Sequence, residues 1–102
     1  MQVRIHVRRP DHPEVSEVIA SDHCVLRFRR RHGIRTPGLD AVGEALQQVF
    51  EEADITRWAP TWLDTPRRTQ MWALHEDLAF PLVPAGEPGA WLAATCLVRG
   101  RE

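Results

Sequence analysis

Six apolar residues between positions 39 and 53 are spaced three or four residues apart, and this spacing constrains the fold more than any other feature of the sequence. They are Leu39, Val42, Leu46, Val49, Phe50 and Ala53. Such spacing gathers apolar side chains on one side of an α-helix of about four turns. The outer side would carry Glu44, Gln47, Gln48, Glu51 and Glu52. We therefore expect a long amphipathic helix whose acidic side faces solvent.

Strand patterns flank the helical region. Residues 2–8 alternate apolar and polar side chains, which is the period of a half-buried strand. Residues 15–20 form a short apolar stretch that either extends the sheet or leads into a helix. Three further strands are predicted at residues 70–74, 78–83 and 90–98, with turns between them. Pro81 indicates that the middle one is bulged or lies at an edge, because proline donates no ladder hydrogen bond.

This order of elements predicts an α+β fold made of a strand, two helices and a three-stranded meander. The simplest packing places two N-terminal helices on one face of a small antiparallel sheet of about four strands. The chain has 102 residues and no internal repeat or linker, so we expect residues 1–102 to form a single domain.

Basic charge is carried entirely by 13 arginines, since lysine is absent. The formal net charge of −1 excludes a protein that binds nucleic acid through its overall charge. The charges are nevertheless segregated. Residues 22–35 hold five arginines and two histidines against one acid, whereas residues 40–54 hold five acids and no base. Local charge therefore decides which surface can meet phosphate.

The basic segment is itself predicted to be helical. Ser21 is a favourable N-cap residue, and the helix is expected to run to about His32. His23, Arg27 and Arg31 stand four residues apart, so their side chains form one row along the helix. The sequence thus predicts a surface that combines one histidine with permanently charged guanidinium groups.

The row of His23, Arg27 and Arg31 suits the cleavage of RNA without a metal. Histidine exchanges a proton near neutral pH, and arginine matches the oxygens of phosphate. One group would take the proton of the ribose 2′-hydroxyl, another would protonate the leaving oxygen, and arginine would stabilise the transition state. The alternative is that His23 caps the helix start while the arginines face solvent. The five histidines form no ligand pair, so neither a metal nor a cofactor is expected.

A family resemblance rests on residues 23–34, which read His-Cys-Val-Leu-Arg-Phe-Arg-Arg-Arg-His-Gly-Ile. This segment resembles the opening of small bacterial families that read His-x-x-x-Arg-apolar-x-x-Arg-x-Gly-Ile. Thr95, Cys96 and Leu97 stand where those families carry a Thr-x-Leu ending on the last strand. The families are similar to the BrnT and RelE-like toxins of the barnase/EndoU/colicin/RelE superfold. Members occur in actinobacteria and phages, and the resemblance covers roughly residues 18–99.

The resemblance implies a toxin-like, metal-independent ribonuclease. It makes His23 the acid/base group and assigns phosphate binding to Arg27 and Arg31. Thr95 would position a phosphate oxygen from the last strand. Further candidates for contacts with nucleic acid are Arg30, Arg35, Trp58 and Trp62. The two tryptophans are expected to cover the edge of the core, with base stacking as the alternative.

The competing hypothesis is a non-catalytic interaction protein of phage or bacterial origin. It would bind a protein or nucleic acid through the basic helix. The expected partners are therefore RNA or a protein such as an antitoxin. No apolar run is long enough to span a membrane, and residues 1–6 lack the apolar core of a signal peptide. We expect a cytoplasmic protein in which Cys24 and Cys96 are buried and reduced.

Overall fold

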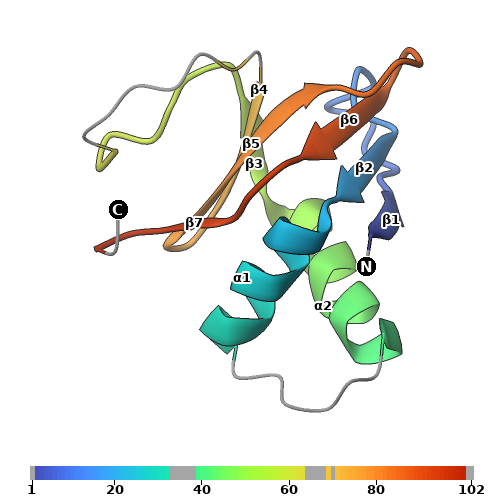
Figure 1. The fold of residues 1–102 in the computed structure, drawn as a ribbon. Coiled ribbons are helices and arrows are strands. Elements are labelled where there is room, and N and C mark those ends of the chain that lie inside the picture. The colour runs from blue at the N-terminus through green and yellow to red at the C-terminus, as the bar shows by residue number, and fades with distance from the viewer. Residues whose placement is uncertain (1, 33–38, 64–68, 70, 101–102) are drawn as a thin grey trace.

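In the described part of the chain, seven strands form one mixed sheet, and two helices pack on the same side of it (Figure 1). The computed structural model describes residues 2–32, 39–63, 69 and 71–100. In chain order the elements are β1 (Val3–His6), β2 (Glu17–Ala20), α1 (Asp22–His32), α2 (Leu39–Glu52), β3 (Asp54–Thr56), β4 (Met71–His75), β5 (Leu78–Pro84), β6 (Ala90–Ala93) and β7 (Leu97–Val98).

The strands are ordered β1-β2-β6-β5-β4-β3, so β1 and β3 form the two edges of the sheet. β2 runs parallel to β6, whereas the other neighbouring pairs are antiparallel. β7 also pairs with β5 in antiparallel fashion. A parallel pair needs a long connection between its strands, and the chain from α1 through β5 provides it.

The predicted antiparallel sheet of about four strands below two N-terminal helices is wrong, although the α+β composition is present. Residues 15–20 extend the sheet and contribute β2, because Val18 and Ala20 alternate with more exposed neighbours and are themselves fully buried. Two strands therefore precede the helices. β3 adds a further strand after α2, and its three residues are too few for periodicity to reveal.

The last predicted strand is two strands, β6 and β7, because a bulge separates them. Ala93 pairs with Leu82. Four residues later, Leu97 pairs with Ala79. Three residues of the last strand thus face two residues of β5, one of which is Pro81. Pro81 indicates from the sequence that its own strand is bulged or lies at an edge. In the structure β5 is a central strand, and the bulge lies in the neighbouring strand.

Three phenylalanines join both helices to the centre of the sheet. Phe28 of α1 lies 6.4 Å from Phe80 of β5, measured between ring centroids. Phe50 of α2 lies 4.9 Å from the same ring. All three rings are fully buried, and their tilted arrangement is favourable for aromatic pairs. The two helices therefore share one anchor in the core.

The start of α1 is held by the N-cap predicted at Ser21. Cys24 N donates to Ser21 Oγ at 3.1 Å, which satisfies one free amide of the first turn. Ser21 Oγ in turn donates to the Ala94 carbonyl at 2.8 Å. Ser21 N donates to the Ala93 carbonyl at 3.0 Å. These bonds fix the basic helix to the bulge in the last strand.

The end of α2 is capped from a distant part of the sequence. Arg9 Nη1 donates to the Ala53 carbonyl and, at 3.4 Å, to the Phe50 carbonyl. The last turn of α2 contains no basic residue, so Arg9 supplies the positive charge that the carbonyl end of a helix favours. The hydrogen bonds that Arg9 donates to Asp11 lower the pKa of that carboxyl group.

The face of the sheet opposite the helices carries a smaller apolar cluster. Trp72, Ala79 and Leu97 form its buried part, and Trp62 and Leu63 pack against it. The segment that follows β3 therefore covers this face. The prediction that Trp58 and Trp62 cover the edge of the core is confirmed for Trp62 and wrong for Trp58, which is 79% exposed.

Both cysteines are buried and free, in agreement with the sequence-based expectation. Burial raises the pKa of the Cys24 thiol, and the neighbouring Cys96 raises it further. The thiol form is therefore strongly favoured at Cys24. Among the described residues, no helix is both long and apolar enough to cross a membrane.

Candidate functional site

A concavity of about 220 Å³ lies beside the basic helix α1. Four of its lining residues are polar residues predicted from the sequence, namely His23, Arg27, Arg30 and Arg31. Leu26 of α1 and Val98 of β7 complete the lining. The structure thus brings together the row of His23, Arg27 and Arg31 and adds Arg30 to it.

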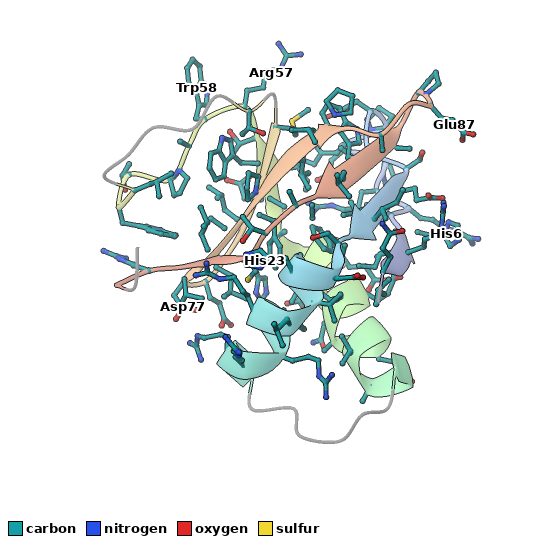
Figure 2. All side chains as sticks on the ribbon, in the orientation of Figure 1. His6, His23, Arg57, Trp58, Asp77 and Glu87 are labelled. Carbon is teal, nitrogen blue, oxygen red and sulfur yellow. The ribbon has the colours of Figure 1, made fainter. Side chains whose placement is uncertain are left out.

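The core contacts of α1 determine which side chains reach the concavity. Cys24 and Phe28 are fully buried and Val25 nearly so, and these residues dock the helix on the sheet. At about 100° per residue, this docking turns His23 and Arg30 toward solvent, where both are exposed. Figure 2 shows the position of His23 on α1. The charged side of the concavity is therefore a consequence of how α1 buries its apolar side.

The end of β7 forms the opposite wall of the concavity. Arg99 N donates to the Asp77 carbonyl at 2.8 Å and so ties this end of the chain to the turn between β4 and β5. Val98, immediately before Arg99, is nearly buried and pairs with Leu78 in the ladder. The wall is consequently part of the sheet, which gives the concavity one rigid side.

Arg31 is committed to an ion pair with Asp77. Its Nη2 lies 2.6 Å from Asp77 Oδ2, and its Nε donates to the same oxygen at 3.1 Å. The side chains are 38% and 34% exposed, so water and salt weaken the attraction. Arg31 therefore joins α1 to the β4–β5 turn, and part of its charge is already neutralised inside the protein.

His23 supplies the imidazole in the described lining of the concavity. It is exposed and makes no hydrogen bond or ion pair with another described residue. Arg27, one turn further along α1, is half-buried and engaged in an interaction within the protein. The imidazole is thus available to a ligand that the neighbouring guanidinium groups attract.

Thr95 is not brought into the concavity. It is 7% exposed and lies in the bulged stretch between β6 and β7. The last strand contributes Val98 instead, three residues later. A role for Thr95 in positioning phosphate stays a prediction, and the geometry gives it no direct access to the groups of α1.

The other residues predicted to contact nucleic acid lie elsewhere. Trp58 is 79% exposed and lies beyond β3, well away from His23 (Figure 2). Trp62 packs on the opposite face of the sheet. Arg35 lies outside the described residues. None of these three therefore adds to the described lining of the concavity.

The sequence did not reveal the roles of Asp77 and Val98. Asp77 lies in the predicted turn after residue 74, but nothing in a turn sequence indicates that it pairs with a helix 46 residues away. Val98 is an apolar residue like many others in strands, so the sequence does not indicate that it lines a concavity. Both contacts are long-range and emerge only when β7 lies beside β5.

Among the described residues, no group of three histidine, cysteine, aspartate or glutamate side chains is arranged to hold a metal ion. The resemblance of residues 23–34 to the BrnT and RelE-like toxins stays a prediction that rests on those residues. Comparisons of the chain with protein-family models, with curated proteins and with solved structures find no match.

Proposed function

We propose that the concavity beside α1 binds the phosphate backbone of RNA. The observation that carries this proposal is the common lining formed by His23, Arg27 and Arg30, which come from successive turns of one helix. Guanidinium groups offer several N–H donors in a fixed plane, and phosphate oxygens accept them well. Arg31 contributes through its Nη1, which takes no part in the contact with Asp77.

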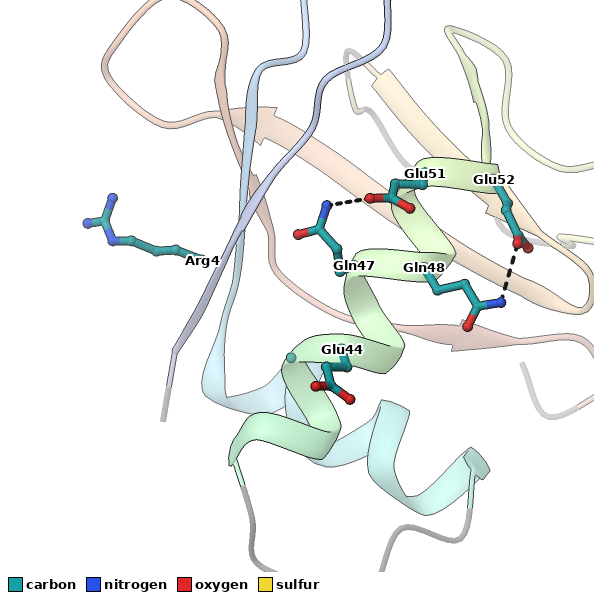
Figure 3. Close-up of a pocket in the computed structure, with 7 residues that line it drawn as sticks. Arg4, Glu44, Gln47, Gln48, Glu51 and Glu52 are labelled. Atoms are coloured by element: carbon teal, nitrogen blue, oxygen red, sulfur yellow. Dashed lines mark hydrogen bonds between the residues drawn. The ribbon is translucent and has the colours of Figure 1, made fainter.

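The net charge of −1 does not oppose this proposal. Electrostatic interactions between exposed charges are largely screened beyond about 10 Å at 0.1 M salt. Glu44, Glu51 and Glu52 of α2 line a separate groove that shares no residue with the concavity (Figure 3). A phosphate at α1 therefore responds mainly to the arginines beside it.

The apolar part of the lining favours a single strand over a duplex. Leu26 is 47% exposed and lies beside the arginines of the lining. It offers a surface against which an unpaired base or a ribose can pack while the arginines hold the phosphate. A paired helix would present its phosphates but keep its base faces stacked inside.

Binding is tested with a fluorescently labelled single-stranded RNA, by anisotropy at several salt concentrations. Arg30 is exposed and carries no partner among the described residues, so Arg30→Gln removes a contact without disturbing the fold. We expect weaker binding and a salt slope that falls by about one. Arg57→Gln, at the far end of the molecule, removes the same charge (Figure 2). An equal loss in both variants would exclude a site at α1.

Cleavage of the bound RNA is the second candidate function. The imidazole of His23, which has no partner among the described residues, favours it. His23 can take the proton of a ribose 2′-hydroxyl held by Arg27 and Arg30. The described lining contains no second imidazole, so the leaving oxygen would take its proton from water. We therefore expect slow cleavage.

The cleavage assay uses RNA in excess chelator and compares wild type with His23→Gln. His6→Gln changes another exposed histidine, on β1, and serves as the control. Cleavage that requires His23 but not His6 supports the ribonuclease proposal. Binding without cleavage leaves the phosphate site in place and rejects catalysis.

A further inference from the structure

A groove of about 810 Å³ runs along the polar side of α2 next to β1, at the edge of the sheet remote from β3 (Figure 3). Its lining consists of one residue of β1 and six of α2: Arg4, Gly43, Glu44, Gln47, Gln48, Glu51 and Glu52. It belongs to a different surface from the concavity beside α1, since the two share no lining residue.

The groove follows the free edge of β1. Within the described chain, β1 pairs with β2 and has no strand on its other side. Val7 N donates to Ser16 O, so the odd-numbered residues of this strand bond to β2. The backbone groups of Arg4 and His6 therefore point to the free edge. Gln47 of α2, a lining residue of the groove, already donates its Nε2–H to the His6 carbonyl at 2.7 Å, so this carbonyl is occupied.

Gly43 leaves the α2 wall open at its N-terminal end. Glycine is unfavourable in a helix interior compared with alanine. A Cβ at this position would have nothing within 4 Å, so packing inside the chain does not account for the missing side chain. A position without a side chain lets another backbone approach closely.

The charge of the groove indicates what can occupy it. Its basic residue, Arg4, is paired with Glu17 at 2.7 Å. Glu44 and Glu51 form no ion pair with another described residue, although Glu51 accepts a hydrogen bond from Gln47 at 3.1 Å. The groove is therefore negative. A second copy of this chain added at β1 would bring its own carboxylates against these two, which disfavours self-pairing.

We propose that this groove binds an extended segment of a partner protein that carries arginine or lysine. The segment adds a strand to β1, and its backbone bonds to the amide and carbonyl of Arg4 and to the amide of His6, whose carbonyl Gln47 already occupies. Alternate side chains of a strand face the same way, so basic residues at every second position meet Glu44 and Glu51. Backbone bonds supply affinity, and the carboxylates select the charge of the segment.

The test measures binding of a short peptide that alternates arginine with valine, by calorimetry on the full chain. The double variant Glu44→Gln and Glu51→Gln removes both of these carboxylates. We expect its Kd for the peptide to rise about tenfold, because two exposed ion pairs are lost. The matched control replaces Glu76 and Glu87 with glutamine. These residues are exposed in the turns on either side of β5, so binding should stay within about twofold of wild type.

Two further measurements test the added strand itself. The same peptide with alternate backbone amides methylated cannot pair with β1 and should not bind. Gly43→Phe fills the groove and should also abolish binding, while circular dichroism shows whether the variant folds. Undiminished binding of the methylated peptide would overturn the proposal even if Gly43→Phe does not fold. A dimer that Gly43→Phe disrupts, with no binding of the peptide, would also overturn it, because the occupant would be a second copy.

Discussion

The two helices pack on one core but differ in how their polar sides are used. On α1, the basic side meets the end of β7 and the β4–β5 turn, where Arg31 pairs with Asp77. On α2, Glu44 and Glu51 lie beside a free strand edge and have no cationic partner among the described residues. The charges of α1 thus face a concavity that β7 closes on one side, whereas the charges of α2 lie along an open groove.

This difference shows why a charged helix cannot be interpreted from its own sequence. Both helices have one apolar and one polar side, and both polar sides would be expected to face water. What separates them is the neighbouring element, which the helix sequence does not contain. The α1 surface is suited to anions and the α2 groove to cations, and the two can be altered independently if their common core is left intact.

The largest expected effect comes from removing the anchor that the two regions share. Phe80→Ala takes away the ring that contacts Phe28 and Phe50, and we expect the free energy of unfolding to fall by about 3–5 kcal/mol. Urea denaturation measures this loss. Binding of RNA and of the arginine peptide should then weaken together. Trp58→Ala, at a position that is 79% exposed, should change the stability by no more than about 0.5 kcal/mol.

Ser21→Ala should affect α1 and spare α2. The hydroxyl accepts from Cys24 N and donates to the Ala94 carbonyl, so its loss removes the N-cap and the attachment of the helix to the bulge. We expect a destabilisation of about 1 kcal/mol in urea denaturation. RNA affinity should fall while affinity for the arginine peptide is unchanged. Ser21→Asn retains a capping oxygen and should recover most of the stability. A larger loss at the α2 groove would show that the two surfaces are coupled.

Much of this local structure could be predicted from the sequence. The apolar spacing of α2, the Ser21 cap and the row on α1 are local patterns, since each depends on residues within a few positions of one another. The Trp62 contact with the core also followed from its apolar character. For the same reason, the buried thiols of Cys24 and Cys96 were expected correctly.

The sheet and the shape of the site depend on contacts distant in sequence and were not predicted. The parallel pairing of β2 with β6 joins Val18 to Trp91, and the Arg31–Asp77 pair joins a helix to a hairpin turn. Neither contact leaves a periodic signal. The bulge that keeps Thr95 out of the concavity depends on the register of β7 against β5, which a one-residue shift would change.

A smaller effect, of opposite sign, is expected at Gly43. Gly43→Ala introduces a methyl group that meets nothing within 4 Å and improves the helix propensity of α2. The free energy of unfolding should rise by about 0.5–1 kcal/mol in urea denaturation. Ala41, which is exposed in the same helix, provides the control: Ala41→Gly should lower the stability by a similar amount. A destabilising Gly43→Ala would mean that the groove is closed in solution.

The smallest effect concerns the end of α2 and its dependence on pH. The hydrogen bond with His75, followed by that with Gln48, lowers the pKa of Glu52 below its ordinary value of 4.5. A carboxyl group whose pKa is lower in the folded chain stabilises the fold above its unfolded pKa, and this contribution is lost as the pH falls through the folded pKa. Glu52→Gln should therefore reduce the difference in stability between pH 6 and pH 3 that urea denaturation measures.

Glu51→Gln is the matched control, because that carboxylate lies one residue earlier and is bonded to Gln47 instead. Its pH dependence should follow wild type more closely than that of Glu52→Gln. Identical pH profiles for wild type and Glu52→Gln would mean that the contact with His75 does not persist in water. The α2 surface would then carry three unpaired carboxylates along the groove, and its contrast with the ion-paired α1 surface would be greater still.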